Sequence, residues 1–151
     1  MKQSLSVVLV VAMALGSLLQ VHAKEQSTRV VQYLYDGDGV KKKVSITAFG
    51  DGPAIATFSV ASNAEKKEIT GEISSEDFEK IWSGFSSIAD LKRSDITSSK
   101  ATVDTDTHHV IFTLEKSSTG TTNRSYGVLA KNAGVDFKAW LRLLEPRVKK
   151  G

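Results

Sequence analysis

The sequence contains no cysteine among its 151 residues. A chain without cysteine has no disulfide bond, no thiolate metal ligand and no thiol nucleophile, so its folded state depends on packing alone. Small secreted domains of eukaryotes are commonly stabilised by disulfide bonds. For an exported chain, the absence of cysteine therefore favours a bacterial origin.

The sequence also lacks a large excess of charge of either sign. It has 20 basic and 17 acidic side chains, a formal net charge of +3. Nucleic-acid binding calls for a concentrated basic face, so we expect no nucleic-acid partner. No Gly-x-Ser-x-Gly elbow and no glycine-rich phosphate loop occurs, and we expect neither a catalytic serine of that type nor a cofactor.

Acidic side chains are absent before Glu25. The first residues instead carry the marks of a secretory signal: Lys2, an apolar run over 5–15, and the sequence Val21-His22-Ala23 as a cleavage site. We predict cleavage after Ala23, which makes 1–23 a signal peptide and 24–151 a single domain. Its removal lowers the net charge by one.

The alternative for this segment is an uncleaved membrane anchor. A membrane-spanning helix needs about 20 consecutive apolar residues, whereas serines, a glycine and a glutamine interrupt the stretch from Leu5 to Val21. We therefore predict a secreted or periplasmic protein with no stable membrane insertion after cleavage.

Four segments before residue 74 are predicted to be β-strands, at 28–35, 44–48, 56–60 and 67–73. The first is dense in valine, tyrosine and leucine, and the second and third alternate apolar with polar residues. The first ends at Asp36-Gly37-Asp38-Gly39, which predicts a hairpin turn. A calcium loop is the alternative for these aspartates. A twelve-residue loop begun at Asp36 would place Val40 and Thr47 where oxygen ligands belong, so we favour the turn.

The clearest helix signal begins at Ser74, a capping residue followed by acidic side chains in the first turn. Apolar residues then recur at spacings of three and four from Phe78 to Ile88. Two further strands, over 110–114 and 124–130, precede a second helix that carries Phe137 and Trp140. The order ββββ-α-ββ-α predicts an α+β fold: a mostly antiparallel sheet of about six strands with two helices on one face.

The segment Gly71 to Trp82, with the pattern Gly-x-Ile-Ser-x-Glu-x-Phe at the entrance to the main helix, resembles uncharacterised bacterial secreted α+β domains. The resemblance extends over most of 28–145 in the order of elements. It implies the fold described above and carries no assigned activity.

The sequence Asp104-Thr105-Asp106-Thr107-His108-His109 is the best candidate for chemistry. If this stretch is extended, Asp104, Asp106 and His108 point to one face and could hold a divalent metal ion. The alternative is that the aspartates are solvated loop residues and the histidines begin a strand, with His109 on its less apolar side. The polar stretch 92–107 is expected to be a long loop.

Two other features have a functional and a structural interpretation. Lys41-Lys42-Lys43 could bind anionic polymers or lipid head groups, but we favour a solvated strand edge where lysines oppose aggregation. Trp82 and Trp140 could line a ligand site, but their helical spacing places them in the core.

These observations predict an exported small domain without enzymatic activity that binds a protein, a peptide or an envelope component. Two alternatives stay open: a metal-dependent or hydrolytic enzyme centred on Asp104 to His109, and a carrier of a small apolar ligand between sheet and helices. A convergent polar pocket near His108 would favour the enzyme, and a large apolar cavity the carrier. A filled core beneath a flat sheet would favour the binding domain.

Overall fold

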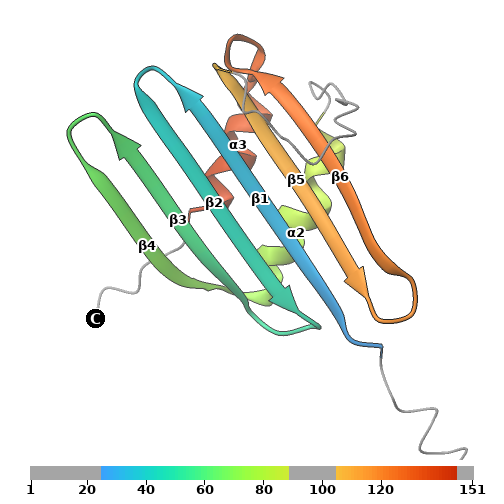
Figure 1. Cartoon of the computed structure of the whole chain (residues 1–151). Helices are drawn as coiled ribbons and strands as arrows, with labels where there is room; N and C mark the ends of the chain where they lie inside the picture. The colour runs from blue at the N-terminus through green and yellow to red at the C-terminus, as the bar shows by residue number, and fades with distance from the viewer. Residues whose placement is uncertain (1–24, 89–104, 146–151) are drawn as a thin grey trace, which may run out of the picture.

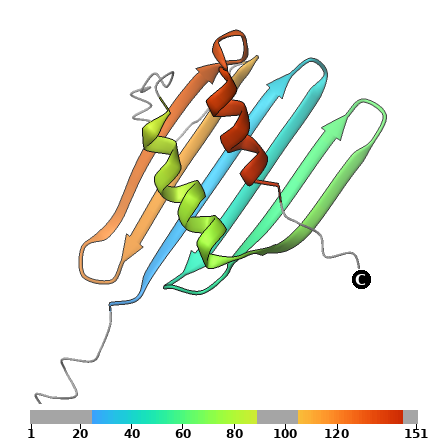
Figure 2. The same cartoon turned by 180° about the vertical axis from the view of Figure 1, so that it is seen from behind.

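The computed structural model describes residues 25–88 and 105–145, which form one antiparallel sheet with two α-helices on one of its faces (Figures 1 and 2). The elements are β1 (Ser27–Gly37), β2 (Val40–Phe49), β3 (Ala54–Ser62), β4 (Lys66–Ile73), α2 (Ser75–Gly84), η1 (Phe85–Ser87), β5 (Thr107–Lys116), β6 (Gly120–Leu129), η2 (Ala130–Asn132) and α3 (Val135–Leu143). The predicted α+β fold and its order of elements are confirmed.

The predicted signal peptide, 1–23, lies outside the described residues. Among the residues that the structure does describe, no helix has the length and apolar character needed to cross a membrane.

The six strands lie in the order β4-β3-β2-β1-β5-β6, and every neighbouring pair is antiparallel. The turn between β1 and β2 has Asp38 and Gly39 at φ values of 53° and 73°. Two successive residues with positive φ are typical of the type I′ hairpin turn, for which Asp-Gly is a preferred sequence. The predicted hairpin is confirmed. Val40 belongs to β2, so no twelve-residue calcium loop begins at Asp36.

Alternation along the strands gives the sheet two different faces. We call the side that packs against α2 and α3 the helix face and the opposite side the open face. Cross-strand partners Val44, Tyr33 and Val110 form one buried row on the helix face, and Ile46, Val31 and Phe112 form the next. Each of these side chains is at most 5% exposed. The hydrophobic core therefore lies between the helices and the centre of the sheet.

Aromatic rings pack the helical segments against the sheet, where Trp82 and Phe85 both contact Phe112 of β5. In α2, the Ser74 hydroxyl accepts a hydrogen bond from the Asp77 backbone N–H at 3.2 Å, as the capping pattern predicted. The indole Nε1 of Trp140 in α3 donates to the Ile81 carbonyl in α2 at 3.0 Å, so the helices are also joined to each other. Trp140 is buried as predicted, whereas Trp82 is only half-buried and packs at the edge of the core.

One prediction about the lysines is wrong. Lys41, Lys42 and Lys43 do not lie on a sheet edge, because β2 is hydrogen-bonded to β1 on one side and to β3 on the other. The edge strand with adjacent lysines is β4, through Lys66 and Lys67. A short apolar run beside charged residues does not reveal which strand will be the edge, since that depends on how the later strands pair.

Candidate functional site

Neither helix covers the open face of the sheet (Figure 1). Small hydroxyl side chains occupy much of it, among them Ser45, Thr47 and Thr57, which are cross-strand or diagonal neighbours on β2 and β3. Two large apolar side chains are solvent-exposed on the same face, Phe49 at 62% and Ile55 at 51%. This face is therefore mixed in polarity and accessible over several strands.

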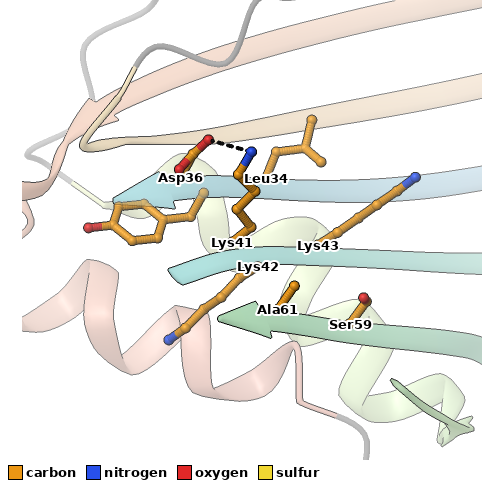
Figure 3. A pocket seen from close by; sticks show the side chains of 8 residues that line it. Leu34, Asp36, Lys41, Lys42, Lys43, Ser59 and Ala61 are labelled. Atoms are coloured by element: carbon orange, nitrogen blue, oxygen red, sulfur yellow. Dashed lines mark ion pairs between the residues drawn. The ribbon is translucent and has the colours of Figure 1, made fainter. Parts of the chain in front are cut away.

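A hollow of about 460 Å³ lies on the open face at the β1–β2 hairpin end (Figure 3). We call it the lysine hollow. Its lining residues are Leu34, Tyr35, Asp36, Lys41, Lys42, Lys43, Ser59 and Ala61. Its position follows from the register, which places Lys43 beside Ser59 and Lys41 beside Ala61. The small side chains of Ser59 and Ala61, beside these two long lysine side chains, leave a depression over β3.

The charges around the lysine hollow are partly compensated. Lys41 Nζ lies 3.4 Å from Asp36 Oδ2, with the two side chains 75% and 39% exposed. An ion pair this exposed contributes at most about 1 kcal/mol and leaves both groups hydrated. Lys43 forms no ion pair within the described residues, and Figure 3 shows its side chain extending away from that of Lys42. Lys43 is therefore the cation most available to a ligand here.

His109 lies next to Leu34 in the register, on the open face. It is only 5% exposed, and its Nε2 atom is buried without a hydrogen-bond partner among the described residues. A buried polar atom left unpaired costs about 1–3 kcal/mol. The sequence predicted His109 on the less apolar side of the strand, and it does lie on the open face. The ring is nevertheless buried there.

His108 points to the opposite, helix face. Its Nδ1 lies 2.8 Å from the Tyr33 hydroxyl, its ring stacks on Tyr35 at 4.5 Å, and the edge of Phe137 approaches it at 5.3 Å. Burial, together with the positive charge of Lys42, lowers the pKa of His108 from 6.5 to about 4. The ring is therefore neutral near pH 7, and its Nδ1 shares a hydrogen bond with the Tyr33 hydroxyl.

The metal-site candidates do not lie on one extended strand. Asp104 lies outside the described residues. Asp106 has φ 57° in the turn before β5, and its backbone N–H donates to the Asp36 carbonyl at 2.7 Å. His108 already has its Nδ1 hydrogen-bonded to Tyr33. Within 25–88 and 105–145, no group of three His, Asp or Glu side chains is arranged to hold a metal ion, and a site that includes Asp104 stays a prediction.

A second, smaller cleft of about 180 Å³ lies between α3 and the helix face. We call it the α3 cleft. Its lining residues are Tyr33, Lys42, Val44, Phe58, Lys138, Leu141, Arg142, Leu144 and Glu145. No local pattern in the sequence indicates this cleft, because Lys138 and Arg142 meet Lys42 only when α3 packs across β2.

A third hollow, of about 250 Å³, lies between α2 and β6. Trp82, Phe112 and Tyr126 form its aromatic wall, and the Arg124 guanidinium carbon lies 5.9 Å from the centre of the Phe112 ring. That contact already uses the aromatic surface which a ligand would need.

No protein-family model, no curated protein and no solved structure matches this chain. The resemblance to bacterial secreted domains therefore rests on the helix entrance and the order of elements alone.

Proposed function

We propose that this protein is an exported, non-enzymatic binding domain that holds an extended acidic peptide segment of a partner protein on the open face of its sheet. The observation that carries the proposal is the lysine hollow, which lies on the sheet face that neither helix covers. Antiparallel sheets commonly leave one face to solvent, so the hollow and its exposed lysine are what distinguish this face from an ordinary solvated one.

The chemistry of the hollow favours a peptide over a densely charged polymer. Lys43 offers one available ammonium, because Lys41 is already opposed by Asp36 and Lys42 points to the helix face. A polyanion would need several uncompensated cations along its path. Leu34 and Ala61 provide an apolar surface beside Lys43. An extended peptide with an acidic residue next to an apolar one matches this arrangement, because its carboxylate can face Lys43 while its apolar side chain contacts the apolar surface.

The helix side of the molecule gives less support to the alternatives. The ring of Phe85 lies 4.9 Å from that of Phe112 and 4.8 Å from that of Trp140, so aromatic side chains occupy the space beneath the helices. The α3 cleft, at about 180 Å³, is smaller than the roughly 300–1,000 Å³ typical of ligand pockets. The charged side chains that line it, among them Lys42 and Lys138, also speak against a carrier of a small apolar ligand.

A peptide titration tests the proposal. The probe is an end-blocked eight-residue peptide of alternating Glu and Leu, and the charge control is the same peptide with Lys in place of Glu. Ser59→Phe fills the hollow and should weaken binding of the acidic peptide at least tenfold. Thr70→Phe is the matched control, because Thr70 is exposed on the same face but does not line the hollow. Equal binding by all three proteins, or stronger binding of the basic peptide, would contradict the proposal.

The exported location is part of the proposal and has its own test. Mass analysis of material from the periplasm or the medium should give a chain that begins at Lys24. A mature protein that keeps Met1 and sediments with membranes would refute the predicted cleavage.

A further inference from the structure

We infer that the α3 cleft is a second binding site, on the opposite side of the sheet from the lysine hollow, and that it takes a small aromatic carboxylate. The ligand's ring would lie on the apolar floor of the cleft, and its carboxylate would face the cations at the rim. This site does not depend on the proposed peptide-binding function.

The floor of the cleft is a single row of the sheet. Phe58, Val44 and Tyr33 are successive cross-strand partners on β3, β2 and β1, and all three point to the helix face. Leu141 and Leu144 of α3 complete the apolar wall. Val44 is 1% exposed and Tyr33 5%, so close packing with their neighbours holds the floor in place.

The rim is cationic. Lys138 and Arg142 are four residues apart on α3 and therefore lie on the same side of that helix, and Lys42 approaches from β2. Within the described residues, none of these three side chains forms an ion pair, and Glu145 is the one acidic side chain of the lining. Three cations and one acid leave two uncompensated positive charges around the opening. An arginine beside a lysine suits a carboxylate, because the guanidinium can bind both oxygens.

The positive charge of the rim also acts at the floor of the cleft. Tyr33 lies at the floor and hydrogen-bonds to His108. After burial, the positive charges of Lys42 and Lys138 are the next causes of the lowered pKa of His108. Two lysines from different elements therefore act on the same point, so an anion bound between them would be attracted by both.

The size of the cleft limits what it can hold. An apolar cavity of about 150 Å³ accommodates one benzene ring. At about 180 Å³ the α3 cleft has room for a single ring, with the carboxylate at the open side. Long acyl chains and fused ring systems are too large.

Benzoate is the probe, and the experiment uses the whole mature chain. Acetate supplies the charge without the ring, and benzyl alcohol supplies the ring without the charge. We expect benzoate to shift the backbone amide signals of Val44 and Leu141 in NMR spectra and to raise the pKa of the His108 ring, because the bound carboxylate offsets the two lysines. Acetate and benzyl alcohol should each bind at least tenfold more weakly.

Adjacent residues of β2 provide matched variants. Lys42→Gln should weaken benzoate binding about fivefold, as expected for removing one partly screened charge near the ligand. Lys43→Gln should leave it unchanged, because Lys43 points to the open face. Arg142→Gln removes a rim charge on α3 and should also weaken benzoate binding. Glu145→Gln removes the acidic side chain of the lining and should strengthen it. Equal binding of benzoate and acetate, or equal effects of Lys42→Gln and Lys43→Gln, would overturn the inference and leave the peptide-binding proposal untouched.

Discussion

The neutral His108 ring makes the stability of the fold depend on pH. In the unfolded chain the ring takes up a proton near its ordinary pKa of 6.5, whereas in the folded protein the pKa is about 4. Between pH 4 and pH 6.5 the unfolded state therefore binds more protons than the folded state. The contribution of His108 to the free energy of unfolding is complete above pH 6.5 and is lost as the pH falls to 4.

The size of this effect follows from the shift. The difference between 6.5 and about 4 corresponds to about 3 kcal/mol. His108 is half-buried and solvent screens part of the effect, so we expect a loss of about 2 kcal/mol between pH 7.5 and pH 4. That is a large fraction of the 5–15 kcal/mol that a domain usually has.

Urea unfolding at pH 7.5 and at pH 4 measures this loss of unfolding free energy. The comparison protein is the double variant Tyr33→Phe, His108→Phe, which removes the titrating ring and also its hydrogen-bond partner, so that neither polar group is left buried alone. The wild-type protein should lose about 2 kcal/mol more than the variant on going from pH 7.5 to pH 4. An equal loss in both proteins, or a His108 pKa near 6.5 in the folded protein by NMR, would refute the reasoning.

Three further changes test the packing. Gly37→Ala should destabilise the fold by about 1–3 kcal/mol in urea unfolding, because a Cβ there would fall on the Tyr35 ring, whose Cζ atom lies 2.7 Å away; unchanged stability would contradict this packing. Ser74→Ala should cost about 1 kcal/mol of unfolding free energy through loss of the helix cap, and Ser74→Asp should recover it. Arg29→Leu should lower the melting temperature at low salt and lower it less in 1 M NaCl, since it removes the 2.6 Å ion pair to Glu79; a salt-independent change would show that the pair contributes nothing.

Most of the fold was predictable from local patterns. The two-residue alternation in 44–48 and the spacing of three and four from Phe78 are direct consequences of strand and helix geometry. Ser74 marked the start of α2 because its hydroxyl satisfies a backbone N–H that the helix leaves free. The hairpin at Asp38-Gly39 followed from the positive φ values that this turn requires.

The sites were less predictable, because they depend on pairing between distant segments. Lys42 meets α3 and Lys43 meets the small side chains of β3 only because β2 lies inside the sheet. The metal hypothesis assumed an extended chain through Asp106, and its φ of 57° turns the backbone there instead. A polar, aperiodic stretch gives no local signal for such a turn, whereas the strand that follows it was correctly anticipated at 110–114.

The proposed use of the open face has one direct measurement. Backbone amide NMR spectra of the mature protein are recorded with increasing amounts of the Glu-Leu peptide, and the shifted signals are placed on the two faces of the sheet. The proposal predicts the largest shifts at Leu34, Lys43, Ser59 and Ala61, with little change at Lys138 and Leu141 of the α3 cleft. Shifts confined to α3 and the helix face, or no saturable shift on the open face, would contradict it.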